Sequence, residues 1–329
     1  MSVNVLLSLA PPDGTTRYVV QLTEGKACNT YYRYFSWVTA LFGRYQVFHV
    51  HWPEQLIRSR GLFPRIIKGL LFRLLLLKIK IFNIAVVRTL HNLHPHETGN
   101  DAETRLLSKL DRLTSLYIRL NAATPMDATK GVTILHGHYI NRYPGAHIAP
   151  SERGRILYFG LIRPYKGIER LLEVFRSLDD NTLSLRVVGR PTRELGDLIK
   201  SASEDDSRIT GLLEFVADDV LATEVYKSEL VILPYKEMHN SGAILVALSL
   251  NRPVLVPRSS SNELLSAEVG KGWVIMYDGE LTKDLVINAL IQIRSEERSK
   301  TPTLGGRDWS VVGEKHYEAY MKAIEMSKR

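Results

Sequence analysis

The segment Arg155-Ile-Leu-Tyr-Phe-Gly160-Leu-Ile-Arg163-Pro-Tyr-Lys166-Gly167-Ile-Glu-Arg-Leu-Leu172 joins a short apolar run to a helical pattern through a polar loop. The spacing of its apolar residues predicts a strand over Arg155–Phe159 and an amphipathic helix over Gly167–Leu178. A strand that leads directly into a helix is the unit from which parallel sheets covered by helices are built. The segment therefore predicts an α/β fold.

The same alternation of apolar runs and helical patterns extends through both halves of the chain. The other runs expected to form strands are Val3–Leu9, Val47–His51, Ile84–Leu90, Leu116–Leu120, Thr133–Leu135, Leu183–Val188, Leu213–Val216, Leu230–Leu233, Val254–Val256 and Trp273–Met276. A polar stretch rich in Pro and Gly, at residues 141–154, separates the two series. The length of 329 residues is about twice that of one typical domain. The pattern predicts two doubly wound, Rossmann-like domains that face each other across a cleft.

The composition is that of an ordinary soluble globular protein, with 45% apolar and 24% charged residues. It excludes a disordered chain, a collagen and a coiled-coil rod. The single cysteine, Cys28, excludes an intramolecular disulfide and a Cys-rich metal site. Because the first residues also lack the basic and apolar regions of a secretory signal, we expect a reducing, cytoplasmic compartment.

The net charge of +8 is concentrated in residues 1–150, which hold 18 Lys and Arg against 8 Asp and Glu. Residues 55–96 contain no acid, and the pattern over residues 58–82 predicts a helix with cations on one side and apolar side chains on the other. The cations are Arg58, Arg65, Lys68, Arg73 and Lys80, and the apolar residues are Phe63, Ile66, Ile67, Leu70, Leu74 and Leu77.

Two interpretations of this basic helix are equally open. It suits an anionic membrane surface, which predicts a peripheral position on the inner face of the cell membrane. It also suits a core helix whose basic edge is solvated. Nucleic acid is less favoured as a partner, because no basic motif interleaved with aromatic residues accompanies the charge.

Histidines stand at the ends of the strands expected in the first half. They occur in His51-Trp52-Pro-Glu, in His91-Asn-Leu-His94-Pro-His96-Glu97 and in His136-Gly-His138-Tyr. Imidazole can both donate and accept protons near neutral pH, so the cluster favours binding of substrate hydroxyls and proton transfer. A metal site is less favoured, because a proline interrupts the spacing and the rings need not converge.

Two predicted helices of the second half begin next to polar strand ends. Arg163 and Lys166 stand directly before one of them, and Ser241-Gly242 begins the other. Backbone amides at a helix start, together with cations, form a binding site for a diphosphate. Two such starts in one domain predict a nucleotide-binding function.

Taken together, these residues resemble those of GT-B glycosyltransferases of the large retaining family 4 and its relatives, over nearly the whole chain. Gly160 to Gly167 resembles the donor-diphosphate loop of the family, in which Lys166 stands in place. The family places an arginine directly after the glycine, where this chain has Leu161, so Arg163 is a shifted substitute.

The segment from Pro234 to Pro253 resembles the Glu-x7-Glu segment of the family with a larger departure. The two family carboxylates would fall near Met238 and Val246, neither of which is acidic. Glu237 is one residue out of register. The resemblance therefore implies diphosphate binding more strongly than it implies sugar and ribose contacts.

The motifs that contain His51, His91 and His138 also resemble a subgroup acting in bacterial exopolysaccharide biosynthesis, which includes xanthan-type β-mannosyltransferases that use GDP-mannose. The resemblance implies an acceptor-binding domain over residues 1–145, a nucleotide-sugar-binding domain over 150–308 and a C-terminal helix over 309–329 that crosses back to the first domain. It implies transfer of a hexose, with mannose from GDP-mannose expected, to a lipid-linked or growing polysaccharide acceptor. No metal or other cofactor is expected, because the cations neutralise the leaving diphosphate.

The expected site residues are His91 and Glu97 for catalysis; Arg163, Lys166, Ser241 and Gly242 for the donor diphosphate; Gly189, Arg190, Tyr235, Glu237, Glu263 and His138 for the donor sugar and nucleotide; and His51, Trp52, His94 and His96 for the acceptor.

The stereochemistry is open, because family 4 retains configuration whereas a β-mannosyl product from an α-linked donor requires inversion. Inversion needs a base, for which His91 and Glu97 are the candidates, and it is slightly favoured by the missing carboxylates. The alternatives are a sugar-nucleotide epimerase of the same fold and a non-catalytic glycan- or nucleotide-binding protein.

Overall fold

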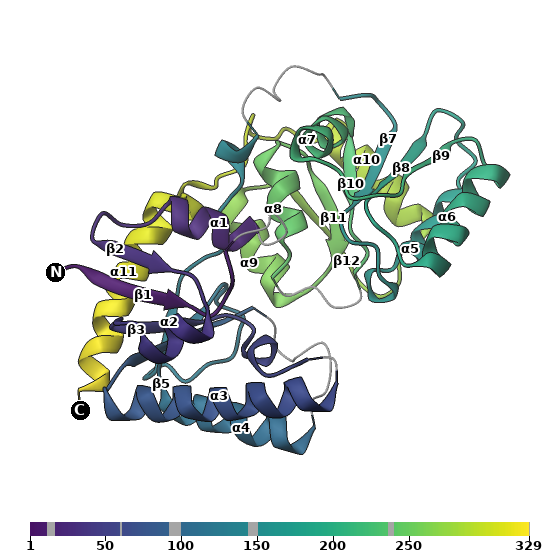
Figure 1. The fold of residues 1–329 in the computed structure, drawn as a ribbon. Helices are drawn as coiled ribbons and strands as arrows, with labels where there is room; N and C mark the ends of the chain where they lie inside the picture. The colour runs from purple at the N-terminus through teal and green to yellow at the C-terminus, as the bar shows by residue number, and fades with distance from the viewer. Residues whose placement is uncertain (12–16, 60, 92–99, 144–150, 236–239, 329) are drawn as a thin grey trace. The chain divides into compact units, whose positions relative to one another are not determined.

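The computed structural model describes residues 1–11, 17–59, 61–91, 100–143, 151–235 and 240–328 of the chain (Figure 1). Packing divides the chain into two compact units. Unit 1 holds Met1–Gly137 and Gly306–Arg329, and unit 2 holds His138–Gly305. The sequence places the end of the first domain at residue 145 and the end of the second at 308. By packing, the described residues 138–143 belong instead to unit 2.

Unit 1 is a six-stranded parallel sheet with helices on both faces, in the strand order β2-β1-β3-β4-β5-β6. Its strands are β1 (Val3–Leu7), β2 (Thr30–Arg33), β3 (Val47–Val50), β4 (Ala85–Leu90), β5 (Thr114–Arg119) and β6 (Gly131–Thr133). Its helices are α1 (Arg17–Glu24), α2 (Trp37–Phe42), α3 (Leu62–Ile81), α4 (Asp101–Leu113) and α11 (Trp309–Ser327). Alternate strand residues face opposite sides: Val5 and Val47 pack with α1 and α11, whereas Leu6 and Phe48 pack with α2, α3 and α4. The C-terminal helix is therefore part of the core of unit 1.

Unit 2 repeats this architecture in the order β12-β11-β10-β7-β8-β9, again with all pairs parallel. Its strands are β7 (Arg155–Phe159), β8 (Ser184–Val188), β9 (Ile209–Leu212), β10 (Leu230–Ile232), β11 (Val254–Pro257) and β12 (Val274–Tyr277). Its helices are α5 (Ile168–Arg176), α6 (Arg193–Asp205), α7 (Asp218–Lys227), α8 (Gly242–Ser249), α9 (Ser260–Val269) and α10 (Lys283–Ser295). The predicted α/β class, with two parallel sheets, is confirmed.

The strand order marks where each sheet places its ligand site. In unit 2 the order turns back at β7, which lies between β8 and β10. Ligands of open parallel sheets bind beyond the carboxyl ends of the strands at such a point. The loops after β7 and β10 are those that contain Arg163, Lys166 and Ser241. In unit 1 the order turns back at β1, which lies between β2 and β3, and His51 and Trp52 directly follow β3.

The three largest departures from the predicted strands lie at the edges of the sheets. β2 was not predicted, β6 begins at Gly131 and not at Thr133, and β9 ends at Leu212, before the apolar run that was expected to form it. An edge strand pairs on one side only and does not need a continuous apolar sequence. In β9, only Ile209 is buried.

Candidate active site

The loop after β7 brings two cations to the carboxyl edge of the unit 2 sheet. A 3-10 turn, Pro164–Lys166, leads into α5, and Gly167 is the N-cap of that helix. Gly167 has φ 69°, and a Cβ at this position would lie 2.3 Å from the carbonyl oxygen of Pro234. Glycine therefore lets the start of α5 pack directly against the end of the β10 segment.

Lys166 lies on the ring of Tyr235. Its Nζ is 4.6 Å from the ring centroid and 3.5 Å from the hydroxyl oxygen. Tyr235 is buried and also donates a hydrogen bond to the carbonyl of Phe159 at 3.4 Å, so it supports the lysine and is itself largely covered. Burial, with a smaller effect from the charge of Arg163, lowers the pKa of Lys166 to about 8. A cation held in such surroundings is stabilised when an anion binds beside it.

Arg163 ties the ends of two neighbouring strands together. Its guanidinium donates to the carbonyls of Ile162 at 2.7 Å and Arg190 at 3.2 Å. The second carbonyl belongs to the loop after β8. Gly189, with φ 139°, permits this approach, because a Cβ there would overlap the carbonyl oxygen of Gly160. The predicted nucleotide residues Gly189 and Arg190 therefore lie beside the predicted diphosphate loop.

The start of α8 is the second element at this edge. Ser241 is the N-cap residue, and its side chain accepts no capping hydrogen bond from the described residues. Ser241 and Gly242 are both partly exposed, so the first amides of α8 can bind solvent or an anion. Tyr139 lies close by, and its amide donates to Ser249 Oγ at 2.8 Å. Glu237 lies outside the described residues.

Two further residues predicted to bind the donor already have partners. Glu263, at the start of α9, pairs with Arg258 at 3.3 Å, and Arg258 also pairs with Asp278 at 3.0 Å. His138 is buried, and its Nδ1 accepts a hydrogen bond from the amide of Ile140 at 3.4 Å.

Three strand-end histidines of unit 1 share one aromatic cluster. The rings of His51, His91 and His136 lie around Tyr18 at centroid distances of 5.9, 5.1 and 5.0 Å. His51 Nδ1 is 2.9 Å from His91 Nε2. Trp52 stacks on His91, with ring centroids 4.0 Å apart and planes inclined by 19°. The structure thus brings together His51, Trp52 and His91, which the sequence placed in two separate motifs.

A second layer of histidines supports this cluster from within unit 1. His49 is hydrogen-bonded through Nδ1 to the hydroxyl of Tyr320 and through Nε2 to that of Thr89, both at 2.8 Å. His316 donates from Nδ1 to the carbonyl of Val312 at 2.7 Å. His49 and Tyr320 are 271 residues apart in the sequence, and nothing local in α11 signals this contact.

Burial keeps these imidazoles neutral. It lowers the pKa of His51 to about 3 and those of His136 and His316 to about 4. The pKa values of His49 and His91 also lie well below the ordinary value, first because of burial and then because of neighbouring histidines. At neutral pH the cluster is therefore uncharged, and each of its imidazoles is a weaker base than an exposed histidine. The predicted residues His94, His96 and Glu97 lie outside the described residues.

The exposed face of α3 differs from a core helix. Phe63, Ile66 and Ile81 are 74, 68 and 62% exposed. The exposed apolar residues recur at helical spacing as Phe63, Ile66, Ile67, Leu70, Leu74, Leu77 and Ile81, whereas Phe72, Leu75, Leu76 and Ile79 form the buried side. The interpretation of α3 as a core helix is therefore wrong for the six apolar residues from Phe63 to Leu77 that it would bury.

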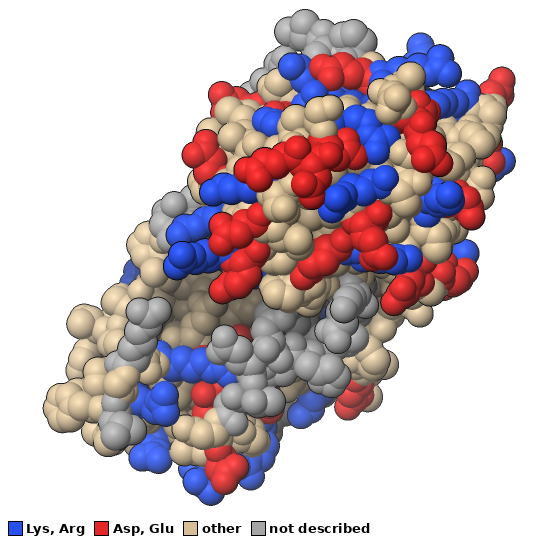
Figure 2. Space-filling view, turned by 90° about the vertical axis from the view of Figure 1, so that its right-hand side faces the viewer, with Lys and Arg blue, Asp and Glu red and all other residues tan. Residues whose placement is uncertain are grey.

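The charges of the two units also differ. On the face of unit 2 seen in Figure 2, Lys and Arg alternate with Asp and Glu, whereas residues 1–150 carry a basic excess. Among the described residues, no helix is both long and apolar enough to cross a membrane.

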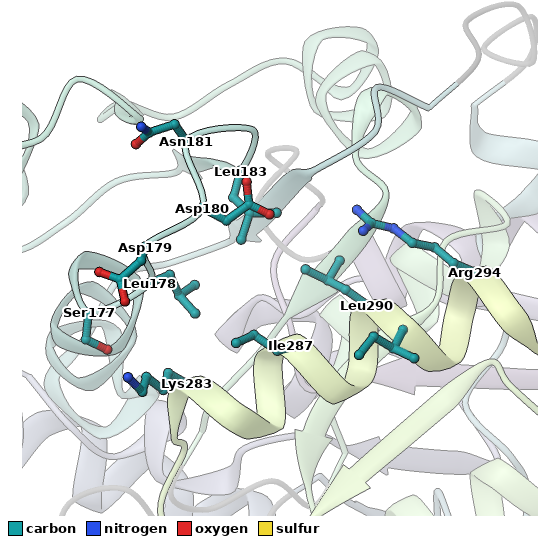
Figure 3. Close-up of a pocket in the computed structure, with 11 residues that line it drawn as sticks. Ser177, Leu178, Asp179, Asp180, Asn181, Leu183, Lys283, Ile287, Leu290 and Arg294 are labelled. Carbon is teal, nitrogen blue, oxygen red and sulfur yellow. The ribbon is translucent and has the colours of Figure 1, made fainter.

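A hollow of about 500 Å³ in unit 2 lies away from these strand ends (Figure 3). It is lined by Ser177 and Leu178, which directly follow α5, by Asp180 and Leu183 before β8, and by Lys283 and Ile287 of α10. These residues belong to the amino-terminal side of the sheet, so this hollow is not the candidate donor site. In the part of the chain that the structure describes, no group of three or more His, Cys, Asp or Glu side chains is arranged to hold a metal ion.

Known proteins resemble this chain in sequence and in fold. Residues 153–293 match the family described as glycosyl transferases group 1. A GDP-mannose:glycolipid 4-β-D-mannosyltransferase from Xanthomonas campestris pv. campestris is 45% identical over 98% of this chain and 93% of its own length. Anabaena HepE in complex with UDP has a similar fold, with a TM-score of 0.65, 15% identity and coverage of 100% of this chain and 99% of its own. WaaG, a glycosyltransferase involved in lipopolysaccharide biosynthesis, gives a TM-score of 0.58 with 13% identity and coverage of 99% of both chains.

The buried histidines make stability depend on pH above the range in which carboxylates titrate. Unfolded histidines take up protons below about pH 6.5, whereas His51, His136 and His316 stay neutral in the folded protein until about pH 3 to 4. The stabilisation is complete above about pH 7 and is lost as the pH falls through 6.5, at up to about 1.4 kcal/mol per pH unit for each histidine. Urea unfolding at pH 7.5, 6.5 and 5.5 should reveal this fall, with a shallower slope in His136→Asn. A free energy of unfolding that stays constant over this range would contradict the prediction.

Proposed function

Because the chain belongs to the group 1 glycosyltransferases, we propose that this glycosyltransferase moves mannose from GDP-mannose to a glycolipid acceptor. The observation that carries the proposal is the 45% identity, over nearly the full length of both chains, to the Xanthomonas enzyme of that name. The donor loop of unit 2 and the histidine cluster of unit 1 supply the two kinds of chemistry that such a transfer needs.

Unit 2 stabilises the leaving group in this proposal. Departure of the nucleoside diphosphate concentrates negative charge on its oxygens. Arg163, Lys166 and the first amides of α5 and α8 stand at the carboxyl edge of one sheet, where they can neutralise that charge. Gly189 and Arg190, at the end of the adjacent strand, border the nucleotide.

Unit 1 activates the acceptor. The β-linkage in the name of the Xanthomonas relative, formed from an α-linked donor, requires inversion and therefore a base near the attacking hydroxyl. His91 is neutral because burial lowers its pKa, and it stands at the end of β4. His91 is accordingly the described candidate for this proton or for contact with the donor sugar, and Glu97 is the second candidate for the base.

In this proposal the exposed face of α3 binds a lipid bilayer. Seven large apolar side chains lie exposed along one stripe of this helix. Arg73 lies beside the stripe at helical spacing and forms no hydrogen bond or ion pair with the described residues. Apolar side chains that insert beside unpaired cations suit a membrane containing anionic lipids. A glycolipid acceptor in the bilayer would then lie at the same membrane surface as the enzyme.

Lys166 should make donor binding depend on pH. Its pKa of about 8 means that it loses its charge just above neutrality, so affinity for GDP should fall about tenfold per pH unit above 8, until the pKa of the complex is reached. Titration calorimetry at pH 7 and 9.5 measures this. The arginine of Lys166→Arg stays charged at pH 9.5, so the affinity of this variant for GDP should not depend on pH. An equal loss of affinity in the variant and in the unaltered protein would contradict the prediction.

Product analysis tests the transfer itself. Incubation with GDP-mannose and a glycolipid acceptor should give a β-mannosyl glycolipid, identified by the anomeric NMR signal. Glu97→Gln should lower turnover at least ~10²-fold if Glu97 is the base, while GDP still binds. A product of retained configuration together with an active Glu97→Gln enzyme would contradict inversion, and conversion of the donor alone would favour an epimerase.

Flotation with vesicles tests the α3 surface. The double variant Phe63→Asn/Ile66→Asn should bind at least about tenfold more weakly to vesicles containing phosphatidylglycerol, since each exposed side chain loses its transfer free energy. Ile287→Asn/Ile291→Asn, on exposed positions of α10 in unit 2, is the matched control and should bind as the unaltered protein does. Equal binding by both variants would exclude α3 as the membrane contact.

A further inference from the structure

Trp52 stands in a backbone conformation that tryptophan rarely adopts. Its φ of 43° and ψ of 65° place it in the left-handed region, where the Cβ of a bulky residue is crowded. Pro53 follows, and a proline restricts the residue before it. Such a conformation persists only where the surroundings hold it, and these positions cluster at functional sites.

Ser8, at the end of β1, holds the chain at this point. Its hydroxyl donates to the carbonyl of His51 at 2.8 Å and accepts from the amide of His51 at 2.7 Å. After the turn, the Trp52 carbonyl accepts from the amide of Gln55 at 3.0 Å. The backbone on both sides of the strained residue is therefore fixed.

The turn sets the Trp52 ring face to face with His91. The two ring centroids are 4.0 Å apart and the ring planes are inclined by 19°, so the imidazole is held nearly parallel to the indole. Within that plane its Nε2 lies 2.9 Å from His51 Nδ1. The ring of Tyr18 packs against that of His91 in a perpendicular, edge-to-face contact. Plane and direction of the imidazole are thus both determined by contacts of unit 1.

We propose that Trp52 and His51 are positioning residues for His91, in which Trp52 fixes the plane of the ring and His51 accepts a hydrogen bond from its Nε2–H. Trp52 was expected to contact the acceptor, and this inference gives it a different task. It rests on the proposed function, in which His91 handles the acceptor proton.

The hydrogen bond determines which His91 nitrogen can react. His51 is fully buried, and its Nε2 has no hydrogen-bond partner among the described residues. Because His91 Nε2 is engaged with His51 Nδ1, a His91 that acts as the base must donate from Nε2, which requires His51 to carry its own proton on Nε2 and to accept through Nδ1. His91 then carries its proton on Nε2, so its Nδ1 is the atom that takes up a proton.

The transfer step balances on this assignment. The acceptor O–H bond breaks and its proton goes to His91 Nδ1, while the oxygen forms a bond to the anomeric carbon. The bond from that carbon to the phosphate oxygen breaks, and its electron pair leaves on the nucleoside diphosphate. His91 becomes an imidazolium that faces the Trp52 ring, an arrangement that stabilises a cation.

Paired substitutions separate positioning from packing. Asparagine has a polar atom in the place of Nδ1, so His51→Asn should keep kcat within about threefold, whereas His51→Leu should lower it at least about tenfold with the KM for GDP-mannose unchanged. The kcat of Trp52→Phe should likewise be higher than that of Trp52→Leu, because phenylalanine keeps an aromatic ring beside His91. Phe48→Leu, on a fully buried residue of β3 that faces the opposite side of the sheet, is the control and should keep kcat. Equal kcat in the Asn and Leu variants of His51 would overturn the inference.

Nitrogen NMR of the labelled histidines gives a readout independent of activity. His91 should show a protonated Nε2 and a bare Nδ1 at pH 7.5, and this preference should weaken in His51→Leu. The opposite tautomer, or the same preference in His51→Leu, would overturn the inference while leaving mannosyl transfer in place. Failure of the unaltered enzyme to transfer mannose, with the tautomer as expected, would instead overturn the proposed function.

Discussion

Parallel pairing forces neighbouring strands to end at the same edge of a sheet, and the candidate site residues of each unit depend on this constraint. Pairing of Val50 with Arg88 brings the ends of β3 and β4 together, so His51 and His91 can touch although 40 residues separate them. In unit 2, pairing of Phe159 with Val188 does the same for the loops that contain Arg163 and Arg190. The chemistry of each unit is assembled by strand register from segments that are distant in the sequence.

Burial has opposite functional consequences for the two kinds of side chain at these edges. A buried imidazole starts from a pKa near 6.5, so desolvation leaves it uncharged at pH 7 and makes it a weaker base. Lys166 starts four units higher, and the same effect lowers its pKa only to about 8, so it remains mostly charged. Desolvation therefore leaves the buried histidines of unit 1 uncharged, whereas Lys166 of unit 2 stays mostly charged at pH 7.

The sequence predicted the GT-B fold class, which is confirmed, and the central strands, because buried parallel strands need continuous apolar runs. It missed or displaced the edge strands β2, β6 and β9, whose pairing needs few apolar residues. The strand-end residues His51, His91, Arg163 and Lys166 could be found because polar groups after apolar runs are conspicuous. Tyr18 and Tyr320 could not, because the contacts that make them part of the cluster arise only when α1 and α11 pack on the sheet.

The position of the second family carboxylate in unit 2 has surroundings that do not suit an acidic side chain. Val246, where the second family carboxylate would fall, is buried, as are the residues of α8 from Ile244 to Ser249. A carboxylate at this position would be desolvated among apolar neighbours without a cation to pair with, at a high cost in free energy. Only Ser241 and Gly242, at the partly exposed start of the helix, remain at the sheet edge. The start of α8 therefore presents backbone amides at the sheet edge, whereas its core-facing turns offer no acidic side chain for the sugar and ribose contacts that the family pair implies.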